Sequence, residues 1–215
     1  MTTAHGNLLK HQAASLRISR AGLDFIFRHE ALAGVSNHLH WPGGSSGVTL
    51  GPGYDMKERD KHAIVGDMLG IGVLNVIADK IAAGSKLVGS KAEDFADDNE
   101  DLVSLTSTQE TALLSVIIPH YESMVRRNVH VHLAQHEFDA LVSFVYNPGG
   151  SFLPVSHAIN KGNVSEAMNI IKGRILTGGH KSGGLLHRRN DEIQLFQHGA
   201  YHRHAHKAHH RSSGQ

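Results

Sequence analysis

The segment "HLAQHEFDALVSFVYNPGG", residues 132–150, constrains the fold of this chain more than any other. Phe138, Leu141, Val142 and Val145 recur at i, i+3, i+4 and i+7, which is the spacing of one apolar face of an α-helix. The Pro-Gly-Gly sequence that follows does not continue a helix and ends it. We therefore predict a central core helix over residues 133–147 and a mainly α fold built around it.

Other segments carry weaker helical signals. Thr106 with Gln109, or Ser107 with Glu110, forms a capping box before a helix that Pro119 should kink. Apolar residues at helical spacing predict further helices over 57–83, with a break near Gly70 and Gly72, and over 154–160, 164–175 and 185–198. A short β-like piece at 47–50 predicts a small hairpin.

Composition bounds the class of protein. The 215 residues are 40% hydrophobic and 19% charged, enough for one core or for two lobes that share an interface. Twenty-one basic and 20 acidic side chains give a net charge of +1, which argues against nucleic-acid or membrane binding. The 19 histidines would make the chain cationic at about pH 5 to 6 and draw it toward anionic polymers such as peptidoglycan. There is no cysteine, so disulfides and zinc-thiolate sites are excluded.

We divide the chain into three parts. Residues 1–17 show little periodicity and are predicted to be a flexible arm. Residues 18–200 form the globular domain, with an enlarged helical insertion at 57–105 whose acidic part, 84–104, is read as a surface loop holding at most a short helix. Residues 201–215 form a histidine-rich tail of low complexity, predicted to be disordered. The tail histidines that could bind Zn²⁺ or Ni²⁺ are His202, His204, His206, His209 and His210, but they lack the spacing of a defined site, so no metal is predicted.

The glycine-rich stretch from residue 29 to 56 carries the most specific chemistry. Glu30 lies seven residues after Leu23 and four after Ile26, at the end of a helix that Ser19 can cap. A carboxyl group among apolar neighbours has its pKa raised by desolvation, which suits a proton donor. Asp55, in a polar turn, suits an ionised partner, and two carboxyl groups of unlike environment are the requirement for glycoside hydrolysis.

Four ordered segments resemble phage-type lysozymes of glycoside hydrolase family 24. They are "ISRAGLDFIFRHE", "GVTLGPGYDM", "LAQHEFDALVSFVYNPGG" and "GGLLHRRNDEIQLF", and the resemblance covers residues 18–198. It implies a two-lobe, mainly α (α+β) lysozyme-like fold with a small β-hairpin lobe. It also implies that Glu30 is the general acid and that Thr49 is the threonine of the hairpin.

The general base departs from the phage pattern. Phage members place an aspartate six residues before the threonine, where this chain has Gly43. Pesticin-like domains of bacteriocins use an aspartate six residues after it, and that position is Asp55 here. We therefore assign Glu30, Thr49 and Asp55 as the catalytic set, with a closer likeness to pesticin-like domains and lysozyme-like effectors of type VI secretion than to phage endolysins.

Four further residues are candidates for substrate binding. Arg188 or Arg189 can pair with Glu30, as a late arginine does in the family, or remain a surface arginine. Asn147 can reach substrate or simply cap its helix. Trp41 can stack on a sugar ring or pack beneath its loop. Tyr54 occupies the place of the family's hairpin-end histidine.

These observations predict a muramidase that cleaves the β-1,4 bond between N-acetylmuramic acid and N-acetylglucosamine in peptidoglycan, by inversion if the carboxyl groups are about 6.5–9.5 Å apart. No cofactor is needed. The alternatives are a catalytically impaired module that only binds glycan, a phage endolysin, and a chitinase-type enzyme.

The expected biological role is that of an antibacterial effector or bacteriocin-like domain, acting as a monomer. Its expected partners are glycan strands, an immunity protein and a secretion-spike carrier. The first 30 residues lack the apolar core of a signal peptide, and no apolar run approaches the ~20 residues of a membrane span. We therefore expect a protein made in the cytoplasm that reaches the periplasm or cell wall without a signal peptide, by injection or through a holin.

Overall fold

The computed structural model describes residues 9–147, 149–177 and 179–202. The elements before the insertion are β1 (His11–Gln12), α1 (Arg20–Glu30), β2 (Thr49–Leu50) and β3 (Tyr54–Asp55). The insertion contains α2 (Lys61–Gly70), α3 (Asn75–Ile81) and α4 (Ser90–Asp98), and it is followed by α5 (Ser107–Asn128) and β4 (His132–Leu133). The remaining elements are α6 (Gln135–Tyr146), α7 (Leu153–Asn160), α8 (Val164–Lys172), β5 (Leu176–Thr177), β6 (His180–Lys181) and α9 (Gly183–His198).

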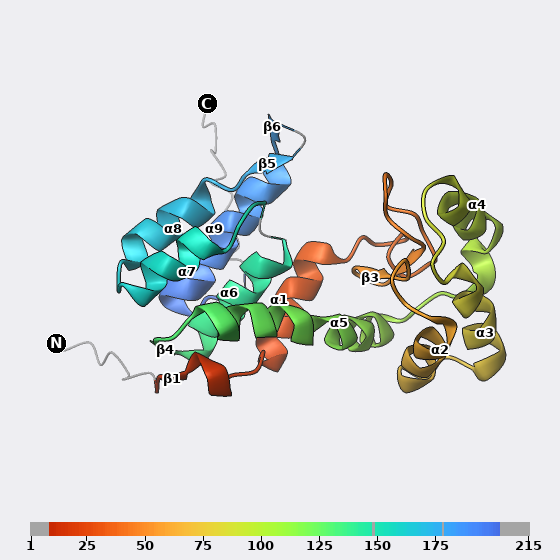
Figure 1. Ribbon diagram of the computed structural model, residues 1–215, viewed down its shortest axis with the longest axis horizontal. Helices are drawn as coiled ribbons and strands as arrows, with labels where there is room; N and C mark the ends of the chain where they lie inside the picture. The colour runs from red at the N-terminus through yellow and green to blue at the C-terminus, as the bar shows by residue number, and fades with distance from the viewer. Residues whose placement is uncertain (1–8, 148, 178, 203–215) are drawn as a thin grey trace, which may run out of the picture.

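The helices form two lobes, and α5 extends from one to the other (Figure 1). In the larger lobe α6 packs against α1, α5 and α9, while α7 and α8 pack on each other. The smaller lobe contains the β2–β3 hairpin together with α2, α3 and α4, and α5 contacts both α2 and β3 there. This arrangement is the mainly α, two-lobe fold that the sequence predicts.

The predicted central helix is the core of the larger lobe. The side chains of Phe138, Leu141 and Val142 on α6 are completely buried (0% exposed), and Val145 is nearly so. The helix ends at Tyr146, ahead of the Pro-Gly-Gly sequence. The spacing that predicted the helix therefore also identified the face that it buries.

Side-chain caps fix the starts of the helices that border the site. Ser19 caps α1 by accepting a hydrogen bond from the Gly22 amide, as predicted. Thr106 and Gln109 form the capping box of α5, which continues through Pro119. A polar residue that accepts the otherwise unpaired amides of a first turn contributes about 1 kcal/mol to a helix. In the insertion the helical pattern is interrupted at residues 71–74, between α2 and α3, as predicted.

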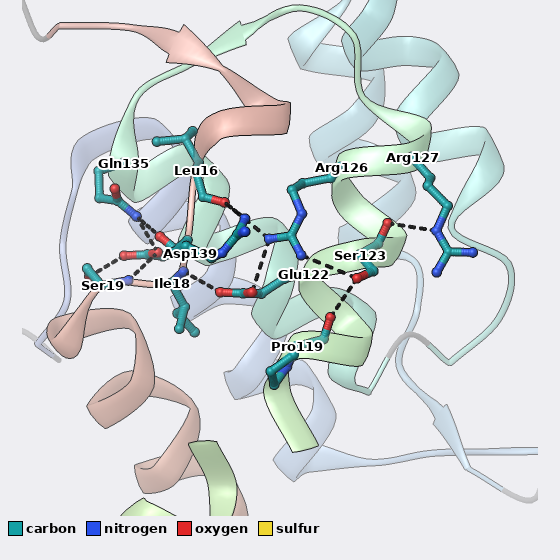
Figure 2. Close-up of polar contacts among 11 residues, drawn as sticks. Leu16, Ile18, Ser19, Pro119, Glu122, Ser123, Arg126, Arg127, Gln135 and Asp139 are labelled. Carbon is teal, nitrogen blue, oxygen red and sulfur yellow. Dashed lines mark hydrogen bonds and ion pairs between the residues drawn. The ribbon is translucent and has the colours of Figure 1, made fainter. Parts of the chain in front are cut away.

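Of the predicted flexible arm, residues 1–17, the structure describes residues 9–17, and this part is held in place. Strand β1 pairs antiparallel with β4, and Ala13 and Leu16 are buried. Two buried carboxylates on the neighbouring helices hold the chain just after this strand (Figure 2). Glu122 of α5 accepts from the Ile18 amide at 2.7 Å, and Asp139 of α6 accepts from the Ser19 amide at 3.1 Å. These contacts join residues more than 100 apart in sequence, so local periodicity did not reveal them.

At the other end, Tyr201 is fixed by a hydrogen bond from its hydroxyl to Asp139 at 2.7 Å. The predicted disordered tail falls mostly on residues 203–215, outside the described residues, as do four of its five candidate metal-binding histidines. His202, the fifth, is exposed. No helix among the described residues is long and apolar enough to span a membrane.

Candidate active site

Glu30 is the last residue of α1, and its side chain is 20% exposed. Its carboxylate accepts a hydrogen bond from the guanidinium of Arg188 on α9, which is 4% exposed. The predicted ion pair between Glu30 and one of the two late arginines is therefore formed by Arg188. Because the two residues come from helices at opposite ends of the chain, the contact fixes the end of α1 against α9.

Arg188 is itself anchored by two further contacts. Its Nε donates to Glu192 at 2.9 Å, and its Nη2 donates to the carbonyl of Ser143 on α6 at 3.1 Å. Burial alone would lower the pKa of the Arg188 guanidinium, but the carboxylates of Glu192 and Glu30 outweigh burial and raise the pKa above its ordinary value. Arg188 therefore remains charged and holds Glu30 in one orientation.

Arg189 completes this buried network. It is 0% exposed, it pairs with Glu192, and its Nε donates to the carbonyl of Arg174 at 3.0 Å. Its Nη2 donates to the carbonyl of Asn147, which is the C-cap residue of α6. Asn147 thus occupies the C-cap position of α6, and its role in substrate binding stays a prediction. The network places two arginines against Glu192 and leaves Glu30 as the member nearest the solvent.

The hairpin presents Thr49 and Asp55 side by side. The two residues are directly opposite in the antiparallel pair β2–β3, and side chains of such a pair emerge on the same face. His40 forms an isolated bridge with Thr49 from the other side and extends this row. The Thr49 hydroxyl donates to the carbonyl of Gly47 at 3.2 Å, which leaves its lone pairs as acceptors.

Backbone amides hold the carboxylate of Asp55. The Lys57 amide donates to Oδ1 at 2.8 Å, and the Gly47 amide donates at 3.2 and 3.3 Å to the two oxygens. Glycine is required at position 47, because a Cβ there would lie 2.5 Å from Oδ1 of Asp55 and 2.8 Å from the Lys57 amide. The absence of a side chain at Gly47 thus creates the space that the carboxylate occupies.

Two tyrosines connect the Glu30 side of the site to the hairpin. The rings of Tyr121 on α5 and Tyr146 on α6 have centroids 4.6 Å apart, and the Tyr146 hydroxyl donates to the carbonyl of Pro52 in the hairpin turn. Burial, and next the negative charge of Glu30, raise the pKa of both tyrosines. Tyr121 also lines a cavity of about 320 Å³ together with Asp55, so it is near the hairpin carboxylate and also feels the charge of Glu30.

The structure does not bring the two aromatic candidates to this cavity. The indole N–H of Trp41 donates to the carbonyl of Ser46 at 3.1 Å, and the half-buried ring lines a different cleft, beside Glu100. Tyr54, predicted to bind substrate, is 0% exposed and donates to Asp67 at 2.5 Å. The Tyr54 ring is covered by the Arg59 guanidinium and its hydroxyl is turned inward to Asp67, so the structure gives no support to the prediction that Tyr54 binds substrate.

Sequence reasoning missed the other residues that line this cavity. They are Arg59, Val116, Ile117, His120 and Tyr121, and Gly53 of the hairpin turn lines the cavity with them. Most of them lie on one face of α5. The sequence predicted this helix, but it did not indicate that this face of the helix meets the hairpin. Arg59 follows β3 closely in sequence, and that proximity to Asp55 was the only available signal. No group of three or more histidine, aspartate or glutamate residues in the described parts of the chain could hold a metal ion.

Comparisons with known proteins bear on the family and the fold. The model of a family described as a domain of unknown function, DUF8812, matches residues 29–141, which include Glu30, the hairpin and the insertion. No curated protein sequence matches the chain. Among solved structures, the endolysin from Escherichia coli O157:H7 phage FAHEc1 is similar with a TM-score of 0.57 at 21% identity, over 88% of this chain and 98% of its own. The muramidase domain of SpmX from Asticaccaulis excentricus is similar with a TM-score of 0.55 at 23% identity, over 84% and 97% respectively. These likenesses confirm the phage-type lysozyme fold.

Proposed function

We propose that this chain, which belongs to the DUF8812 family, is a muramidase that hydrolyses the β-1,4 bond between N-acetylmuramic acid and N-acetylglucosamine in peptidoglycan. One observation carries the proposal. Within a phage-type lysozyme fold, the buried Arg188 fixes Glu30 at the end of α1, and Tyr146, which feels the charge of Glu30, donates to the turn of the hairpin that carries Thr49 and Asp55. The structural relatives are an endolysin and a muramidase domain, which supports a substrate of the same class.

The proposed reaction divides the work between the two carboxyl groups. Protonated Glu30 donates its proton to the glycosidic oxygen as the bond between that oxygen and the anomeric carbon breaks. Asp55 takes a proton from a water molecule, whose oxygen bonds to the anomeric carbon, and Thr49 accepts a hydrogen bond from that water. The amides of Gly47 and Lys57 keep the Asp55 carboxylate oriented for this step. No cofactor takes part in the scheme.

The proposal is tested by digesting purified peptidoglycan with wild type, Glu30→Gln and Asp55→Asn, and by identifying the reducing ends that are released. We expect muramic-acid reducing ends from the wild type and a loss of about 100-fold or more in rate for each variant, the magnitude of general acid–base catalysis. Glu58→Gln is the matched control, because Glu58 is exposed and lies only three residues from Asp55. Thermal unfolding shows whether each variant is folded.

Three results would contradict parts of the scheme. A folded wild type that binds sacculi without releasing reducing ends would favour a glycan-binding module, which the glycine at position 43 already suggests. Release from chitin but not from peptidoglycan would indicate a chitinase-type enzyme. Activity that survives Asp55→Asn, but not Glu30→Gln, would remove Asp55 from the mechanism.

We further propose that the activity serves an antibacterial role in the periplasm. Expression of the chain with an added export signal in a Gram-negative bacterium should lyse the cells, and Glu30→Gln should not. Lysis by both proteins, or by neither, would count against this role.

A further inference from the structure

Arg59 is held beside Asp55 by contacts of three kinds. Its Nε donates to the main-chain carbonyl of Asp55 at 3.1 Å. Its guanidinium carbon lies 4.1 Å from the centroid of the Tyr54 ring, a cation–π contact, and its Nη1 lies 3.6 Å from Oδ2 of Asp67. The side chain is 28% exposed and lines the same cavity as Asp55. An arginine side chain that makes a hydrogen bond, a cation–π contact and an ion pair together has little freedom to move.

The anchor of Arg59 comes from the insertion. Asp67 is on α2, and it accepts a hydrogen bond from the buried Tyr54 hydroxyl at 2.5 Å. Burial, followed by the hydrogen bond to Asp67, raises the pKa of Tyr54, so the phenol remains a neutral donor over the working range of an enzyme. Tyr54 and Asp55 are adjacent on β3, and both are therefore tied to α2 through Arg59 and Asp67.

The two sets of contacts meet at one residue. The amides of Gly47 and Lys57 hold the side chain of Asp55, and Arg59 holds its main chain. β3 is only two residues long, so few ladder hydrogen bonds fix its direction. Rotation of the Asp55 peptide would move the carboxylate away from its amide donors, and the guanidinium of Arg59 opposes that rotation.

We propose that Arg59 is a positioning residue for Asp55, and that Tyr54 and Asp67 anchor it so that the insertion takes part in the active site. The proposal rests on the proposed function, in which Asp55 directs water. Charge alone does not explain Arg59, because the ammonium of a lysine has neither a flat face for Tyr54 nor the fixed fork of donors. A misplacement of about 1 Å of a reacting group can cost roughly 100-fold in rate, so loss of this restraint should be visible in turnover.

The test compares Arg59→Lys and Arg59→Met with Lys61→Met, which removes an exposed positive charge two residues away. We expect both Arg59 variants to lower kcat by about 10- to 100-fold and to change KM by less than about threefold, because positioning acts on the chemical step. Lys61→Met should leave both constants unchanged. Tyr54→Phe keeps the ring but loses the donor to Asp67, and it should lower kcat less than Arg59→Met does.

Nuclear magnetic resonance gives a readout that does not depend on activity. The amide signals of Gly47 and Lys57 report their hydrogen bonds to the Asp55 carboxylate, and both signals should move in Arg59→Met and stay in place in Lys61→Met. Unmoved signals would overturn the proposed role of Arg59 whether or not the wild type is active. An inactive wild type, by contrast, would count only against the proposed function. A rise in KM at constant kcat would also overturn the proposed role of Arg59, because Arg59 would then bind substrate directly. Full activity in Arg59→Lys would overturn the proposal in its present form, because it would show that a positive charge at position 59 is sufficient.

Discussion

Asp139 joins three parts of the larger lobe, and its replacement by asparagine is the sharpest test of how Tyr201, just after α9, and the start of α1 are held. Asp139 is 0% exposed on α6. Its Oδ1 accepts from the Ser19 amide at 3.1 Å and from Gln135 at 2.8 Å. Its Oδ2 accepts from the Ser19 hydroxyl at 2.5 Å and from the Tyr201 hydroxyl at 2.7 Å.

The magnitude follows from these four bonds. Asp139→Asn has nearly the same shape, but it places an NH₂ group where Oδ2 accepts from two hydroxyls. Hydrogen bonds to a charged group contribute about 1.5–3 kcal/mol, against about 0.5–1.5 kcal/mol for neutral ones. Both hydroxyls can rotate to accept instead, so part of the loss is recovered. We therefore expect the free energy of unfolding to fall by about 2–4 kcal/mol. At roughly 2–4 °C per kcal/mol for a chain of this size, Tm should fall by about 5–15 °C.

Thermal and urea unfolding measure the effect, with Asp24→Asn as the control. Asp24 also accepts from one arginine on its own helix, but its side chain is 42% exposed, so its loss should cost no more than about 0.5 kcal/mol. Tyr201→Phe should destabilise the wild type more than it destabilises Asp139→Asn, since the two residues share a bond. If Asp139→Asn unfolds within 2 °C of Asp24→Asn, roughly 1 kcal/mol or less, the reasoning fails.

The remaining predictions concern glycines and tyrosines. Gly22→Ala should destabilise, because its Cβ would lie 2.5 Å from Cγ of Asp139, whereas Gly66→Ala on the open side of α2 should stabilise by about 0.5–1 kcal/mol; urea unfolding of the pair checks both signs. Gly47→Ala should fold but lose most hydrolysis of peptidoglycan, because its methyl group displaces the Asp55 carboxylate; activity equal to wild type would show that this carboxylate is not needed in place. Burial raises the pKa of all four tyrosines above the ordinary 10.0, so absorbance at 295 nm should show little tyrosinate in the folded protein at pH 10.5, and a substantial fraction in urea. The folded state retains these protons at a pH where the unfolded state loses them. The tyrosines' contribution to the free energy of unfolding is therefore fully present below about pH 10 and should be lost as the pH rises above it.

Features that depend on neighbours in sequence were predictable. The spacing of Phe138, Leu141 and Val142 is a property of one helix, and it identified both the helix and its buried face. The caps at Ser19 and Thr106 were equally legible, because a cap and its amide lie only three residues apart. Glu30 could be singled out by its position on an apolar face.

Features that depend on long-range packing were not predictable. Tyr121 reaches the site because α5 crosses between the lobes, and no local pattern encodes which face of a helix meets a hairpin. Tyr54 occupies the position of the family's hairpin-end histidine, which suggested a place in the cleft, yet its side chain turns inward to Asp67. The arm before α1 lacks periodicity because it pairs through only two residues, His11 and Gln12.

The backbone explains why the proposed base lies after Thr49 and not before it. Gly43, at the position of the phage aspartate, has φ +103°, a conformation that side chains with a Cβ rarely adopt. The loop around it is held by the bond from Trp41 to Ser46, so the strain of another residue there could not easily relax. Position 55, in contrast, lies in extended backbone, faces the side-chain-free Gly47 and is tied to α2 through Arg59. In the proposed scheme the insertion and the shifted carboxylate belong to one arrangement, because Arg59 and Asp67 tie the main chain of β3 to α2.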